Sequence, residues 1–119
     1  MTILVVDDSS VMRKIVIRSL RQAGYGDHEV VEAEDGAEAL ARIRSSTPDV
    51  VLSDWNMPNM SGLELVTALR AEGNQVPFGF VTSESTAEQF AAGIGAGASF
   101  LLSKPFTAED LAANLGAIL

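Results

Sequence analysis

The chain has 119 residues, 47% of them apolar and 20% charged, with a formal net charge of −8 and no cysteine. This composition favours one globular domain, 1–119, long enough to bury a hydrophobic core. The lack of cysteine excludes disulfides and thiolate metal sites, and the acidic balance argues against nucleic acid as a direct partner. No apolar stretch has the length of a membrane span and no signal peptide is visible, so we expect a cytoplasmic protein with no membrane partner.

Strand-like and helix-like segments alternate five times along the chain. Apolar runs predict strands at 2–7, 28–33, 49–54, 77–82 and 99–102. Amphipathic spacing predicts helices at 10–23, from 35 onward, at 62–72, at 86–96 and at 107–118. The predicted N-caps, each with its capping-box partner, are Asp35 with Glu38, Ser61 with Glu64, Ser85 with Glu88, and Thr107 with Asp110. Five β-α units in this order predict an α/β fold, with a doubly wound parallel sheet and helices on both of its faces.

Polar residues of different kinds follow four of the predicted strands. Asp7 and Asp8 follow the first strand, Asp54 ends the third, Thr82 ends the fourth and Lys104 follows the fifth. In open α/β sheets, ligands bind outside the carboxyl ends of the strands. We therefore expect three carboxylates, a hydroxyl and an ammonium to meet at one sheet edge, a set that suits Mg²⁺ and phosphate.

Simpler explanations exist for these residues, and Thr82 alone is weak evidence because threonine is common in strands. A helix N-cap accounts for one acid at 7–8, but adjacent carboxylates repel each other unless a cation lies between them. Mg²⁺ accepts one or two carboxylates and keeps several waters. Asp54 could begin a loop, or act as a nucleophile toward phosphorus beside a bound metal. Lys104 could pair with Asp54 or with a phosphoryl oxygen, and its bond to Pro105 is a candidate cis peptide.

Four motifs together resemble the receiver domain of two-component response regulators. They are Val5–Ser10, Asp54–Gly62, Val81–Glu84, and Gly97-Ala98 followed by Lys104–Phe106. The second motif is most similar to chemotaxis regulators of the CheY type. The resemblance covers the whole chain and implies the flavodoxin-like strand order 2-1-3-4-5, a single receiver domain and no output domain.

The resemblance also implies roles for the site residues. Asp54 would accept a phosphoryl group from a sensor histidine kinase or a phosphotransfer protein. Mg²⁺ would be held by Asp8, Asp54 and the backbone carbonyl of Asn56, with Asp7 reaching it mainly through water. Asn56 and Glu84 would tune the lifetime of the phosphoryl group, which we expect to be short.

The signal would leave the site through Thr82 and Lys104, which bind the phosphoryl oxygens in the resemblance. The face formed by 86–96, 99–102 and 107–118 would then change and bind a downstream protein. Relatives usually carry Tyr or Phe three residues before the lysine, where this chain has Leu101. The neighbouring Phe100 should point to the opposite face of its strand, since side chains alternate.

Two other functions compete with a phosphorylation-controlled module that is not an enzyme toward other substrates. One is a Mg²⁺-dependent phosphohydrolase with an aspartyl nucleophile, although such enzymes place their acids as D-x-D after the first strand. The other is a receiver-like scaffold that is not phosphorylated, which the complete set of acids argues against.

Overall fold

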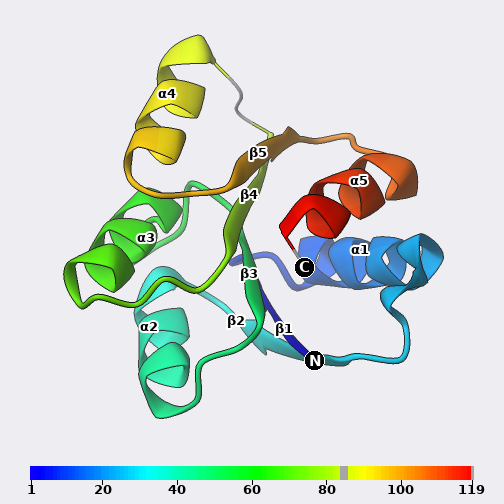
Figure 1. Ribbon diagram of the computed structural model, residues 1–119, viewed down its shortest axis with the longest axis horizontal. Helices are drawn as coiled ribbons and strands as arrows, with labels where there is room; N and C mark the ends of the chain where they lie inside the picture. Colours follow the sequence, from blue (N-terminus) through cyan, green and yellow to red (C-terminus); the bar gives the residue numbers. More distant parts are fainter. Residues whose placement is uncertain (84–85, 119) are drawn as a thin grey trace.

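The computed structural model describes residues 1–83 and 86–118 as strands and helices in alternation (Figure 1). The strands are β1 (Thr2–Val6), β2 (Glu29–Ala33), β3 (Val50–Ser53), β4 (Phe78–Thr82) and β5 (Phe100–Ser103). The helices are α1 (Ser10–Leu20), α2 (Gly36–Ser45), α3 (Gly62–Ala71), α4 (Ala87–Gly95) and α5 (Ala108–Ile118), with a π-helical turn, η1 (Arg21–Tyr25), after α1. No helix in these described ranges is long and apolar enough to cross a lipid bilayer.

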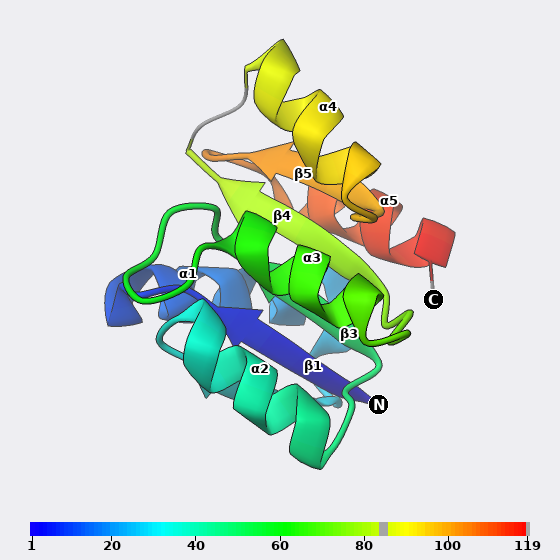
Figure 2. The same ribbon diagram turned by 90° about the vertical axis from the view of Figure 1, so that its left-hand side faces the viewer.

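All strand pairs in the sheet are parallel, and the strand order is β2-β1-β3-β4-β5. This confirms the predicted fold class and strand order. Helices α2, α3 and α4 cover one face of the sheet, and α1 and α5 cover the other (Figures 1 and 2). The carboxyl ends of β1, β3, β4 and β5 therefore reach one edge, which is where the predicted site residues lie.

Alternation along each strand divides the core into two apolar layers. In β1, Leu4 and Val6 pack in the layer under α2, α3 and α4, whereas Ile3 and Val5 pack in the layer under α1 and α5. Among the described residues, no buried side-chain nitrogen or oxygen lacks a hydrogen-bond partner. Both faces of the sheet are thus covered by packed apolar side chains.

Three of the four predicted N-caps are confirmed. The side chains of Asp35 and Ser61 accept from the backbone N–H groups of Glu38 and Glu64, and Ser61 forms the reciprocal capping box. At α2 the predicted reciprocal bond is wrong by one residue, because the Glu38 carboxylate accepts from the N–H of Glu34 and not from that of Asp35. Thr107 and Asp110 exchange the same pair of bonds at the start of α5.

The fourth predicted cap is wrong by one residue. Thr86 caps α4 and forms a capping box with Gln89, in place of Ser85 with Glu88. Both pairs fit the local motif, so the sequence pattern alone does not distinguish them. Ser85 and Glu84 lie outside the described residues.

The first predicted helix also ends differently. Regular α-helix stops at Leu20, and η1 continues the chain to Tyr25. Gly24 within this turn has a φ of 99°, a left-handed conformation that glycine adopts without steric cost. Gly24 therefore breaks the regular helical backbone at the predicted position, although α1 ends earlier, at Leu20, and η1 extends beyond Gly24 to Tyr25.

Candidate functional site

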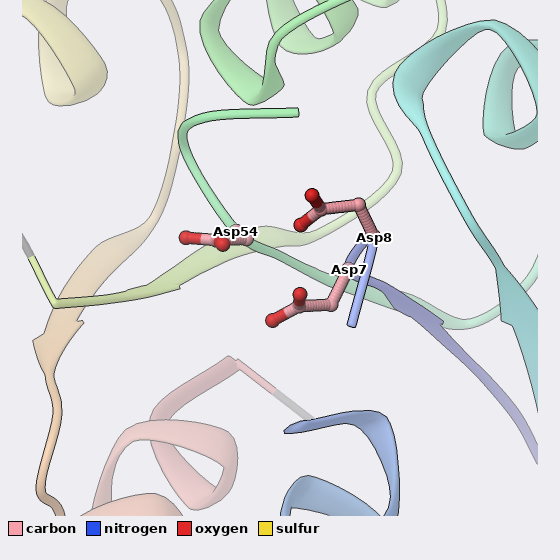
Figure 3. Close-up of side chains that lie close together, drawn as sticks. All are labelled: Asp7, Asp8 and Asp54. Carbon is pink, nitrogen blue, oxygen red and sulfur yellow. The ribbon is translucent and has the colours of Figure 1, made fainter. Parts of the chain in front are cut away.

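Three aspartates converge at the carboxyl edge of the sheet (Figure 3). Asp7 and Asp8 directly follow β1, and Asp54 directly follows the neighbouring strand β3. Each aspartate offers one carboxylate oxygen, and these atoms lie within 4.8 Å of one another. Asp7 is buried, Asp54 is partly exposed and Asp8 is exposed, so the cluster opens to solvent on the side of Asp8.

Asp7 forms hydrogen bonds through its backbone and through both carboxylate oxygens. Its backbone N–H donates to the carbonyl of Ala33 at 3.1 Å. Its Oδ1 accepts from the N–H of Ser9 at 2.9 Å, and its Oδ2 accepts from Lys104 Nζ at 3.2 Å. Its carbonyl oxygen accepts from Arg13 Nη1 at 2.7 Å. The orientation of this carboxylate is therefore set by the surrounding structure before any ligand binds.

Ser9, and not one of the two adjacent acids, is the N-cap of α1. Its hydroxyl oxygen accepts from the backbone N–H of Met12 at 3.3 Å and caps α1. The N-cap of α1 therefore accounts for neither Asp7 nor Asp8.

Asp54 is a partly buried acid whose side chain is 16% exposed. Its Oδ1 accepts from the backbone N–H of Trp55 at 2.7 Å. Burial raises the pKa of Asp54, and the negative charge of Asp7 adds to that effect. The Trp55 N–H, the ammonium of Lys104 and a hydrogen bond from Thr82 act in the opposite direction without cancelling it.

Lys104 follows β5, and its ammonium lies between two acids. Nζ is 3.2 Å from Asp7 Oδ2 and 3.8 Å from Asp54 Oδ2, so its nearer partner is Asp7. The peptide bond from Lys104 to Pro105 is cis, as the sequence allowed. One ammonium cannot balance three ionised carboxylates. Hard oxygen donors that carry excess negative charge, beside an opening to solvent, suit Mg²⁺, which keeps several of its waters.

The remaining predicted residues surround this cluster. Thr82 is buried at the end of β4. Asn56 lies two residues after Asp54 and is exposed. Glu84 lies outside the part of the chain that is described. Leu101 packs in the layer under α2, α3 and α4, whereas Phe100 packs in the opposite layer, which confirms the expected alternation.

Arg13 is a site residue to which sequence reasoning gave no role. Besides its bond to the Asp7 carbonyl, its Nε is 2.9 Å from Glu32 Oε1 on the edge strand β2, and its side chain is only 11% exposed. In the sequence, only the position of Arg13 in the helix, five residues after Asp8, could have indicated that it lies near the site. The exposed Lys14 is at almost the same position, so this feature does not distinguish the two residues.

Comparison with known proteins places this arrangement in a family. The family model of the response regulator receiver domain matches residues 3–116. The transcriptional regulatory protein PrrA of Mycobacterium tuberculosis is 42% identical over 117 residues, which are 98% of this chain and 49% of PrrA. The chain thus spans about half the length of the curated relatives it matches.

Solved structures agree with the family model. The chemotaxis protein CheY4 of Vibrio cholerae is 39% identical, with a TM-score of 0.86 over 99% of this chain and 98% of that one. The signal receiver domain of the putative regulator NarL from Mycobacterium tuberculosis is 28% identical, with a TM-score of 0.85 over 98% and 93% of the two chains. This chain belongs to the family of response regulator receiver domains.

Proposed function

We propose that this chain is switched by a Mg²⁺-dependent transfer of a phosphoryl group to Asp54 from a phosphohistidine. Receiver domains of two-component response regulators are phosphorylated, generally bind Mg²⁺ at an acidic pocket and interact with histidine kinases. The observation that carries the proposal for this chain is the convergence of Asp7, Asp8 and Asp54 beside Lys104.

The chemistry requires a carboxylate nucleophile and neutralisation of charge. A carboxylate oxygen of Asp54 would form a bond to phosphorus while the bond from phosphorus to the donor imidazole nitrogen breaks. The product is an acyl phosphate, and the imidazole leaves and later takes a proton. Phosphoryl transfer depends on alignment and charge stabilisation more than on further covalent help from the protein. In this role the bound cation would neutralise phosphoryl oxygens.

The protein residues have separate tasks in this proposal. Asp8, Asp54 and the carbonyl of Asn56 would hold Mg²⁺, with Asp7 reaching it through water. Asp7 is suited to this outer role because its own oxygens already accept from Ser9 and Lys104.

Thr82 and Lys104 would bind the phosphoryl oxygens. The position of Lys104 supports this task, since its ammonium lies 3.8 Å from Asp54 Oδ2 and 3.2 Å from Asp7 Oδ2. A phosphoryl group on Asp54 would offer this ammonium a more strongly charged partner than either carboxylate.

The donor we propose is a sensor histidine kinase or a phosphotransfer protein. An open apolar groove of about 330 Å³ lies beside the site, lined by Met12, Ile15, Lys104, Pro105 and Phe106. The segment Ser10–Leu20 that forms one wall carries three basic residues and no acid. This surface suits a partner with apolar side chains and acidic neighbours, and it shares Lys104 with the acidic site.

The output surface we propose is formed by α4, β5 and α5, where Phe90 of α4 is 51% exposed and Ile94 is 38% exposed. Two pathways remain open for a cytoplasmic regulator of this kind. Similarity to CheY4 supports chemotaxis, and similarity to PrrA supports control of transcription.

Acetyl phosphate and mass spectrometry test the proposal directly. With Mg²⁺, the wild-type chain should gain one phosphoryl group, and Asp54→Asn should gain none, because an amide cannot form the acyl phosphate. Chelation of the metal should suppress labelling of the wild type. Labelling of Asp54→Asn to the wild-type level would contradict the proposal.

The same assay separates the competing functions. A receiver catalyses only its own phosphorylation and dephosphorylation, so it should not hydrolyse aryl phosphates steadily in excess over the protein. Steady turnover would favour a phosphohydrolase. A wild-type chain that is never labelled would favour an unphosphorylated scaffold.

A further inference from the structure

Strands β4 and β5 carry large and small side chains in reciprocal positions. In the sheet register Phe80 pairs with Leu101, and both pack in the layer under α2, α3 and α4. On the opposite face Gly79 pairs with Phe100, and a Cβ added to Gly79 would overlap the Phe100 ring. The aromatic ring on the α4 side of this strand pair therefore comes from β4 and not from β5.

Phe80 is joined to the acidic site by a second ring. The Trp55 and Phe80 ring centroids are 4.7 Å apart, within the range of favourable aromatic contact. Trp55 is also the residue whose backbone N–H donates to Asp54 Oδ1 at 2.7 Å. One member of the aromatic pair, Trp55, is thus the residue that directly follows the proposed phosphorylation site, Asp54.

Helix α4 rests on this pair through a glycine. Gly93 is the one buried residue of α4, all of whose residues Ala87–Gly95 are described. A Cβ added to Gly93 would lie 3.0 Å from Phe80 Cε2 and 3.2 Å from Trp55 Cζ3. At Gly93 the backbone of α4 therefore packs directly against both rings, with no side chain between the helix and the rings. A movement of either ring would act on the helix backbone itself.

We propose that the Trp55–Phe80 ring pair, against which Gly93 seats α4, couples the phosphorylation state of Asp54 to the position of α4 in this chain. This inference rests on the phosphorylation of Asp54 proposed above. In it, Leu101 fills space beside Phe80 and does not transmit the change.

The physical basis is a change of charge next to a densely packed contact. Phosphorylation adds about −1.5 to −2 charge, and hydrogen-bond donors around the carboxylate reorient toward the new oxygens. The N–H of Trp55 is one such donor. Thr82, another proposed phosphoryl ligand, lies two residues after Phe80 and so on the same face of β4. Protein interiors are packed like organic crystals, so a displaced ring moves its neighbours.

The test uses beryllofluoride with Mg²⁺ as a stable substitute for the phosphoryl group. The fluorescence of Trp55, the one tryptophan of the chain, reports the near end. Hydrogen exchange of the α4 backbone amides reports the far end. Both should respond in the wild type. In Phe80→Leu the fluorescence response should persist, while the α4 response falls about fivefold or more, the lower range of coupling between sites. Leu101→Ala should retain the α4 response.

Two glycines of α4 supply a matched pair of variants that does not depend on Phe80→Leu folding well. Gly93→Ala and Gly95→Ala add the same methyl group to the same helix, and alanine has the higher helix propensity at both positions. A Cβ at Gly95 meets nothing within 4 Å, whereas one at Gly93 presses on both rings. Gly95→Ala should respond as the wild type does, and Gly93→Ala should show altered resting exchange in α4 and a reduced response.

The outcomes separate this inference from the proposed function. If the wild-type chain shows no Mg²⁺-dependent response to beryllofluoride at Trp55 or α4, the proposed function and the coupling are both overturned. If the wild type responds at both ends and Phe80→Leu or Gly93→Ala responds in full, the coupling alone is overturned. Loss of the α4 response in Leu101→Ala but not in Phe80→Leu would overturn it as well.

Discussion

Asp54 and Asp35 show how strongly local surroundings decide the behaviour of one residue type. Burial raises the pKa of Asp54. Hydrogen bonds lower the pKa of Asp35, the largest effect coming from the backbone N–H of Glu38 and the next from the Asn59 side chain. Asp54 therefore binds its proton more tightly in the folded chain than in the unfolded chain, and Asp35 binds its proton less tightly.

These opposite shifts predict opposite effects of pH on stability. Protonated Asp54 contributes stability below its unfolded pKa of about 3.9, and this contribution is lost as the pH rises through the higher folded pKa. Asp54→Asn should therefore raise the free energy of unfolding at about pH 7 in chelator, and raise it less near pH 3.5. Urea unfolding of both proteins at the two pH values measures this difference.

Asp35→Asn is the matched control for that experiment. Asparagine keeps the N-cap of α2, so the loss at neutral pH should be small. The contribution of Asp35 is present above its unfolded pKa and is lost as the pH falls through the lower folded pKa, so any cost of the substitution should shrink in acid. If the free energies of unfolding of the two variants changed with pH in the same way, the opposite pKa shifts of Asp54 and Asp35 would be contradicted.

At the scale of elements, the contact between β4 and β5 depends on pairing a large side chain on one strand with a smaller residue on the other. Phe100 is buried, and its ring fills the space above Gly79, while Phe80 and Leu101 pack on the other face. The two faces of this strand pair are therefore complementary in size, and each large side chain needs a smaller partner in register.

Gly79→Ala tests this complementarity. The added methyl overlaps the Phe100 ring, so the substitution should lower the free energy of unfolding by about 1–3 kcal/mol, as overpacking does. Phe100→Leu in the same chain removes the ring and should make Gly79→Ala much less costly. A double-mutant cycle from urea unfolding gives the coupling energy, and strictly additive effects would show that the two positions do not compete for space.

At the scale of the whole molecule, the acidic site is built by the sheet and not by any one segment. Asp7 and Lys104, which form a hydrogen bond, are 97 residues apart in the chain. A cation that binds the folded cluster and not the unfolded chain must stabilise the fold as a whole. At 100 times its dissociation constant, Mg²⁺ should add about 2.7 kcal/mol to the free energy of unfolding.

Chelation should remove this stabilisation, and Asp8→Asn should lose most of it. Because Asp8 is exposed, the substitution should change the stability of the metal-free chain little. Unfolding measured at constant ionic strength, with and without Mg²⁺, separates site binding from general screening of the net charge of −8. An equal gain in wild type and Asp8→Asn would place the cation elsewhere.

The sequence by itself determined the features that depend on neighbouring residues. Alternating strand and helix patterns predicted the parallel sheet, and its carboxyl edge brought Asp7, Asp8 and Asp54 together as expected. Local motifs also predicted the caps at Asp35 and Ser61, because an N-cap side chain and the N–H group that it accepts from lie within four residues. Strand alternation was sufficient to place Phe100 and Leu101 on opposite faces.

Only the tertiary structure decided the choices between equivalent local solutions. Thr86 caps α4, although Ser85 fits the same local motif. Lys104 lies nearer Asp7 than Asp54, and Phe100 takes the space that Gly79 leaves open. These outcomes depend on distances between distant segments, which no local pattern contains. The packing of strands and helices alone sets those distances.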